Sequence, residues 1–153
     1  MRVFASLADF VAAKGETLGQ SEWHKITQEQ VNAFADATGD HQWIHVDIER
    51  AASGPFGGTI AHGYLTVSLL PVLMTEIFRV DNLTMGINYG LDRVRFPSPV
   101  LTGSSIRAEA TLTDVRQTQL GSLAHIRMRI EIDGQEKAAC IADTLSLFVG
   151  RPS

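Results

Sequence analysis

The sequence has little cysteine and lacks the apolar segments of an exported protein. Its 153 residues contain one cysteine, Cys140, which has no second cysteine for an internal disulfide. Cys140 lies in the apolar run AACIADTLSLF, where a buried small side chain is expected rather than a nucleophile. The N-terminal segment MRVFASLADFVAAKGE has no apolar core of signal-peptide length. A reducing compartment suits such a chain, so we predict a cytoplasmic protein.

Long apolar runs, basic runs and repeats are also missing. No stretch approaches the ~18 uninterrupted apolar residues of a membrane span, so no membrane partner is expected. The net charge is −4 and there is no long basic run, which argues against a nucleic-acid partner. Because no linker or composition change divides the chain, we predict one domain over residues 1–153, a length sufficient for a hydrophobic core.

The first half of the chain predicts mainly helices. Residues 61–78, AHGYLTVSLLPVLMTEIF, are apolar nearly all round, which indicates a buried central helix with a kink at Pro71. Before it, Thr27 and Gln30 form a capping-box pattern at the start of a helix that Gly39 ends. Shorter elements are expected around these: a helix at 6–15, a strand in SEWHKI at 21–26, and one or two helical turns at 48–54.

The second half predicts strands. After Asp81, four long segments alternate apolar and polar residues, the pattern of half-buried strands. Turn signals separate them at Pro97–Pro99, Leu120–Gly121 and Asp133–Gly134. Four consecutive long strands favour an antiparallel meander, with SEWHKI as a fifth strand. One buried helix and a curved antiparallel sheet form an α+β layer architecture.

The stretch TGDHQWIHVD places an acid, Asp40, five residues before an imidazole, His45. Five residues do not bring two side chains to one face of a helix or a strand. The two can meet only if the segment turns back, and Gly39 supplies the backbone freedom to do so. We therefore predict an irregular loop that carries an acid–base pair, with an Asx-turn and a half-exposed histidine as the structural alternative.

A second stretch, GPFGGTIAHGYLT, places His62 and Gly63 at the start of the central helix. The first N–H groups of a helix have no internal partner, and this end carries partial positive charge. Since Gly63 has no side chain to block an approach, its N–H could stabilise charge on a carbonyl oxygen. The alternative is a loop-to-helix junction that needs a small residue.

Two further sets of residues were considered for ligands. A metal site could use His41, His45, His62 and Asp47, but there is no Cys pair or HExxH motif, so we predict no metal. Arg93 and Arg95 share one face of a strand and could contact phosphates, although such residues are more often the solvated face of a sheet.

Taken together, TGDHQWIHVD, IAHGYLTVSLL and INYGLDRVRFPSPVLTGSSI resemble the MaoC-like, (R)-specific enoyl-CoA hydratases over nearly the whole chain. The form GDHQWIH is similar to the nodulation-protein-N-like branch, with Gln42 and Trp43 where the family usually has Asn and Pro. The resemblance implies a hot-dog fold, in which an antiparallel sheet wraps around a long central helix, and a homodimer.

The resemblance also assigns roles to residues. It implies that Asp40 and His45 are the catalytic pair and that the Gly63 N–H binds the thioester oxygen. Ser68 on the same helix, together with Gln42 and His62, would support the substrate. An acyl chain would lie near Trp43, Tyr64 and Leu65, and the possible phosphate contacts of Arg93 and Arg95 would serve coenzyme A.

The expected function is reversible water addition to a trans-2-enoyl-CoA to give a (3R)-hydroxyacyl-CoA. Water addition is redox-neutral, so no cofactor is expected, and an acyl-CoA thioester is the expected partner. Two alternatives remain at this point: a hot-dog thioesterase, in which water attacks the carbonyl carbon, and an acyl-CoA-binding module without turnover.

Overall fold

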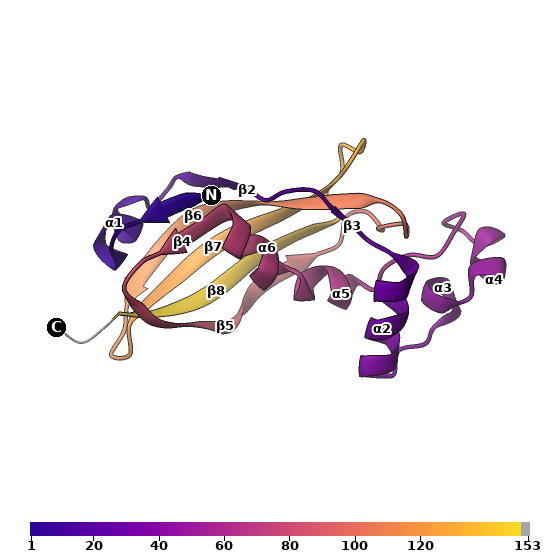
Figure 1. The fold of residues 1–153 in the computed structure, drawn as a ribbon, viewed down its shortest axis with the longest axis horizontal. Coiled ribbons are helices and arrows are strands. Elements are labelled where there is room, and N and C mark those ends of the chain that lie inside the picture. Colours follow the sequence, from indigo (N-terminus) through magenta and orange to yellow (C-terminus); the bar gives the residue numbers. More distant parts are fainter. Residues whose placement is uncertain (151–153) are drawn as a thin grey trace.

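The computed structural model describes residues 1–150, and its helices gather along one face and one end of a sheet (Figure 1). The helices are α1 (Leu7–Ala12), α2 (Gln28–Thr38), α3 (Trp43–Val46), α4 (Ile48–Ala52), α5 (Gly63–Ser68) and α6 (Leu70–Ile77). The strands are β1 (Arg2–Phe4), β2 (Thr17–Gln20), β3 (His24–Lys25), β4 (Phe78–Val80), β5 (Leu83–Arg95), β6 (Ser105–Gln117), β7 (Ser122–Ile132) and β8 (Cys140–Gly150).

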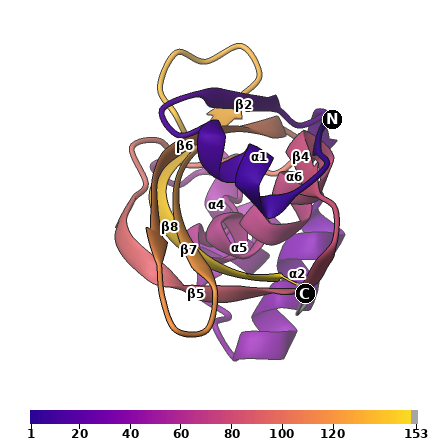
Figure 2. The ribbon, with the colours of Figure 1, turned by 90° about the vertical axis from the view of Figure 1, so that its left-hand side faces the viewer.

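The large sheet curves around α5 and α6, as the end-on view shows (Figure 2). Strands β6, β7 and β8 alternate buried and partly exposed residues over most of their length, so one face packs on the helices. The inward side chains are mostly fully buried; they include Ile106, Leu112, Ile126, Met128 and Ile130. The predicted α+β architecture is therefore confirmed.

The predicted meander is only partly right. The strands run in the order β2-β6-β7-β8-β5, so β6, β7 and β8 are consecutive antiparallel neighbours but β5 pairs with β8. The segment after β5, with Pro97 and Pro99, is thus not a hairpin. It crosses over from β5 to β6, past the positions of β8 and β7 in the same sheet. Chain order alone cannot show this, because an alternating strand fits either neighbour equally well. Strand β5 is left at one edge of the sheet.

The central helix predicted at 61–78 is two helices. Helix α5 ends at Ser68 and α6 starts at Leu70, so the break precedes Pro71, which sits in the first turn of α6. A proline is tolerated there because its missing N–H has no helical partner at that position. The helices are also not wholly buried, since the side chains of Tyr64 and Val72 are exposed.

The N-terminal segment covers the end of the sheet away from α2. Strand β1 pairs in parallel with β4, an interaction that local sequence patterns did not predict. Helix α1 is shorter than the helix predicted at 6–15, and Ser6 caps its start by accepting the N–H of Asp9. Phe10, Phe78 and Phe148 form an aromatic cluster, with ring centroids of Phe10 and Phe78 5.3 Å apart. No helix within residues 1–150 is long and apolar enough to cross a membrane.

The strand predicted in SEWHKI is confirmed only as the two residues of β3, and the preceding β2 was not predicted. Both pair with β6, which places this short chain segment along the other edge of the sheet. The turns at Gly121 and Gly134 lie where they were predicted, and both glycines have positive φ angles.

Candidate active site

Asp40 is placed by the end of α2. Thr27 caps the start of this helix by accepting the N–H of Gln30, and Gly39 ends it in the left-handed conformation, at φ 83°. The chain then reverses, and the carboxylate of Asp40 accepts the backbone N–H of Gln42 at 3.3 Å. The Asx-turn considered from the sequence is thus present. Asp40 itself stays exposed, so its second oxygen is free to meet a water or a substrate.

His45 lies on one turn of helix, α3, where an irregular loop was predicted. Its side chain is buried, and its Nδ1 lies 2.7 Å from the backbone oxygen of Ile60. A carbonyl oxygen only accepts hydrogen bonds, so Nδ1 carries a proton, and in the neutral ring Nε2 keeps its lone pair. The backbone oxygen of His45 in turn accepts from the side chain of Gln28, which ties α3 to α2. His45 is therefore held by hydrogen bonds at both its ring and its backbone.

The electrostatic environment keeps His45 unprotonated. Burial lowers the pKa of its imidazole from the ordinary value of 6.5, and the neighbouring His62 ring lowers it further. The hydrogen bond to Ile60 and the charge of Asp40 act in the opposite direction but do not cancel the effect of burial. A neutral imidazole near pH 7 is the form that a general base needs.

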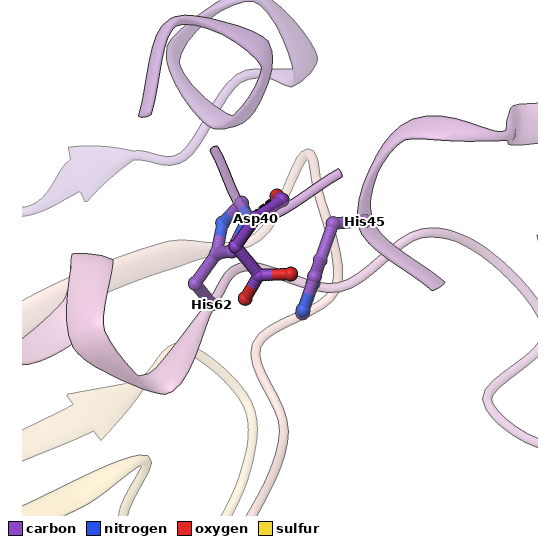
Figure 3. Close-up of side chains that lie close together, drawn as sticks. All are labelled: Asp40, His45 and His62. Atoms are coloured by element: carbon purple, nitrogen blue, oxygen red, sulfur yellow. Dashed lines mark hydrogen bonds between the residues drawn. The ribbon is translucent and has the colours of Figure 1, made fainter. Parts of the chain in front are cut away.

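Asp40, His45 and His62 come together (Figure 3). One carboxylate oxygen of Asp40 and one ring nitrogen of each histidine all lie within 4.8 Å of one another. A water that donates one hydrogen bond to each of two acceptors spans roughly 4.4 Å between them. The pair Asp40 and His45 can therefore share one water, as the acid–base hypothesis requires.

The same three residues also carry the types of side chain that bind metal ions. The rings of His45 and His62 stack with centroids 3.9 Å apart and an interplanar angle of 24°. Imidazole lone pairs lie in the ring plane, so two stacked rings do not direct them at one ion. The other two residues considered for a metal are engaged elsewhere: His41 with Asp36, and Asp47 as the cap of α4. The arrangement fits a bound water better than a metal.

Gly63 is the first residue of α5, directly after His62. The side chain of His62 does not cap the helix, so it leaves the first N–H groups of α5 unblocked. A Cβ on Gly63 would lie 2.9 Å from the ring of Phe96, which shows how closely the two segments approach. A hollow of about 300 Å³ adjoins Gly63, between Phe56 and Phe96.

The comparisons with known proteins identify the family of this chain. Residues 9–131 match the family model described as MaoC like domain. The chain belongs to the MaoC-like dehydratase family. It is 53% identical to 3-hydroxyacyl-thioester dehydratase Z of Mycobacterium tuberculosis (strain ATCC 25618 / H37Rv), over 97% of this chain and 99% of that protein.

The predicted branch is supported as well. The chain is 44% identical to Nodulation protein N of Rhizobium leguminosarum bv. viciae, over 97% of this chain and 94% of that protein. Among solved structures, the (R)-hydratase from A. caviae involved in PHA biosynthesis superposes with a TM-score of 0.72 at 25% identity, covering 88% of this chain and 95% of that one. The hot-dog fold expected from the resemblance is confirmed.

Several residues of this MaoC-like chain that the resemblance assigned to substrate binding make contacts within the protein or differ in exposure. Ser68 donates its hydroxyl to the backbone oxygen of Tyr64, one turn back on its own helix. Tyr64 is 75% exposed, whereas Leu65 is buried in the core. Trp43 stacks under the guanidinium of Arg50, 4.2 Å from its ring centroid. The parts of these residues in substrate binding stay predictions.

The two arginines of β5 are exposed. Arg93 lies opposite Asp143 on β8 and contributes to the lowered pKa of that carboxylate, mainly set by Arg127. Arg95 lies beside Phe96, the residue that approaches Gly63. Their contact with a phosphate stays a prediction.

The structure adds an apolar groove that sequence analysis missed. Two adjoining hollows of about 260 and 240 Å³ lie between α6 and the strands β5 and β8. They share four lining residues: Pro71, Met74, Asn88 and Ser146. No sequence signal joins these positions, because they come from three elements that only the curved sheet brings together.

Proposed function

We propose that the protein is an (R)-specific enoyl-CoA hydratase, which adds water reversibly to a trans-2-enoyl-CoA. The observation that carries the proposal is the acceptor pair: the exposed carboxylate of Asp40 within 4.8 Å of a ring nitrogen of the buried His45, whose Nδ1 is bonded to the backbone of Ile60. The named relatives support it, since one is a 3-hydroxyacyl-thioester dehydratase and one solved structure is an (R)-hydratase. Dehydration of a 3-hydroxyacyl thioester is the same reaction in reverse.

The proposed chemistry uses one water between Asp40 and His45. The water oxygen forms a bond to the β-carbon while one of its protons passes to this pair, and the α-carbon takes up a proton from the pair. The π electrons of the double bond shift toward the thioester carbonyl in the transition state. The N–H of Gly63 then stabilises the developing negative charge on that oxygen. No redox cofactor or metal takes part in this scheme.

The apolar groove beside α6 is the proposed place for the acyl chain. It begins near Ser68, on the helix that starts at Gly63, so a thioester at Gly63 can direct its chain along α5 toward α6. Met74 lines both hollows. Met74→Trp should fill the groove and lower kcat/KM for octenoyl-CoA more than for crotonyl-CoA. An equal effect on both substrates would place the chain elsewhere.

We also propose a homodimer that forms through β5. Within the described residues this 13-residue strand pairs only with β8, and its exposed side chains include Met85, Ile87, Tyr89 and Leu91. A long apolar edge strand is an aggregation hazard unless it is covered. A second copy of the chain, paired along the same edge, would cover it with a symmetric interface.

Crotonyl-CoA separates the three candidate functions. Loss of the enoyl absorbance without release of free thiol indicates hydration, whereas free thiol indicates a thioesterase. Binding without either change indicates a non-catalytic module. The proposal fails if the pure protein produces thiol or produces no change.

The stereochemistry requires a separate assay. One water held at one place attacks one face of the enoyl group, so a single isomer is expected, and the family resemblance gives it as (3R). A coupled assay with an (S)-specific 3-hydroxyacyl-CoA dehydrogenase should therefore form no NADH. NADH formation in step with hydration would refute the (R) assignment, and a racemic product would refute the single water.

A further inference from the structure

His62 contacts both members of the catalytic pair. Its ring lies at the start of α5 and is 2% exposed. The Nε2 atom is 2.9 Å from the backbone oxygen of Asp40, and because a carbonyl only accepts, Nε2 must carry the proton. His62 therefore donates a hydrogen bond to the main chain of the residue that supplies the carboxylate.

The same ring also forms one wall of the His45 site. It stacks on His45 with centroids 3.9 Å apart, and Phe34 lies on it at 4.9 Å with its plane tilted by 53°. His45 thus lies against a ring that is itself held by α2. Rotation of the His45 imidazole about its Nδ1 hydrogen bond is restricted by this contact.

A purely structural role does not account for a histidine here. Within residues 1–150 the Nδ1 atom of His62 is buried and has no hydrogen-bond partner. A buried polar atom without a partner costs about 1–3 kcal/mol, which an apolar ring of similar size would avoid. The fold would be better served by phenylalanine, so the N–H on the opposite side of the ring must be what the position requires.

We infer that His62 is a positioning residue, which holds the main chain of Asp40 with its N–H and the ring of His45 with its face. The inference rests on the proposed catalytic role of Asp40 and His45. It differs from the substrate-binding role predicted for His62, because the donor of His62 is already used by the protein.

The space that His62 fills also affects the pKa of His45, because the stacked ring helps to bury it. The titratable groups facing His45 are His62, from the start of α5, and Asp40, from the connection after α2. Burial and His62 lower the pKa of His45, and Asp40 opposes them. A side chain that fills less of the stack than His62 admits water to the His45 ring. Weaker burial raises the pKa of His45, because burial is the main cause of its lowering.

Two variants separate the two contacts. His62→Phe keeps a ring against His45 and loses the donor to Asp40. His62→Gln keeps a side-chain N–H and loses the ring. The matched control is His24→Gln, which replaces a surface histidine that pairs with Glu76, away from the site.

For His62→Phe we expect kcat to fall about 10- to 100-fold with little change in KM, the effect of a displaced catalytic group. In an Asp40→Asn background, His62→Phe should lower kcat by a much smaller factor, because the hydrogen bond acts through Asp40. If kcat falls by the same factor in that background, the role of His62 is merely structural. Wild-type kcat in His62→Phe would overturn the donor role.

For His62→Gln we expect the acid limb of kcat/KM to move to higher pH. NMR titration of the histidine rings gives a readout that needs no turnover: the pKa of His45 should rise in His62→Gln and stay unchanged in His24→Gln. An unmoved His45 pKa would overturn the inference. If the wild-type protein hydrates no enoyl-CoA but His45 titrates as expected, the proposed function fails while the positioning role stands.

Discussion

At the scale of single residues, the site depends on which lone pairs are left free. The Nδ1 of His45 is bonded to Ile60 and one oxygen of Asp40 to Gln42, which leaves Nε2 of His45 and the second oxygen of Asp40 as acceptors. His62 uses its Nε2–H on the backbone oxygen of Asp40, and its Nδ1 has no partner within residues 1–150. The catalytic proposal therefore depends on two atoms, and each can be removed without changing the size of its side chain much.

Asp40→Asn and His45→Gln should each lower turnover of crotonyl-CoA at least ~100-fold, the usual size of an acid–base contribution. Asp40 is exposed, so Asp40→Asn should leave thermal unfolding close to that of the wild type. His45→Gln loses a buried hydrogen bond and should be somewhat less stable. Near-normal kcat in either well-folded variant would remove that residue from the mechanism.

The pH dependence follows from the lowered pKa of His45. Only the neutral imidazole can accept a proton, so activity that depends on it is lost as the pH falls through that pKa. Because burial lowers the pKa, the loss should occur below pH 6.5. NMR titration, with the His45 signal assigned from the His45→Gln spectrum, measures it directly. A His45 pKa above 6.5 would contradict the burial argument.

Activity should survive removal of metal ions. The stacked rings of His45 and His62 do not converge on one ion, and the scheme needs no Lewis acid. Dialysis against a strong chelator should leave kcat unchanged. A loss that a divalent ion restores would show that the three residues bind a metal after all.

At the scale of elements, the hairpin between β6 and β7 depends on one glycine. Gly121 has φ 156°, and a Cβ there would collide with the backbone carbonyl of Phe148 on β8. The clash involves main chain on both sides, so neither strand can relieve it by a change of rotamer. This turn therefore sets how closely β8 can approach the hairpin.

Gly121→Ala should lower the free energy of unfolding by about 2–4 kcal/mol, since it adds a clash to an unfavourable φ. Gly134→Ala is the matched control: φ is 75°, but a Cβ there meets nothing within 4 Å. It should cost only about 1 kcal/mol. Urea denaturation measures the free energy of unfolding of both variants. Equal losses of stability would mean that backbone strain alone, without the clash, explains the effect.

At the scale of the whole molecule, two surfaces carry exposed apolar side chains: strand β5 and the helix segment 61–78. Strand β5 is exposed along nearly its whole length, and Tyr64 and Val72 are exposed on the helices. The helix segment 61–78 has no polar face in the sequence, yet part of it meets solvent in one copy of the chain. The second copy proposed above would cover both surfaces.

Light scattering at micromolar concentration should therefore report about twice the 16.7 kDa chain mass. Ile87→Lys and Tyr89→Glu place charges on the exposed edge and should shift the protein toward monomer. Arg116→Glu, on the exposed end of β6, is the control and should leave the mass unchanged. A wild-type protein that scatters only as a monomer would contradict the homodimer.

The sequence by itself determined what local chemistry controls. Thr27 and Gly39 set the bounds of α2 because capping involves groups within a few residues. The alternating strands and the turns at Gly121 and Gly134 follow for the same reason. The pairing of Asp40 with His45 was also predicted, although the residues meet across one turn of helix and not within a loop.

Only the tertiary structure decided the rest. The place of β5 beside β8 depends on a crossover that strand patterns do not encode. The tautomer of His45 is set by Ile60, 15 residues away, and its ring is held by His62. Hydrogen bonds and stacking between distant residues have no period in the sequence, so they become visible only when the chain is folded.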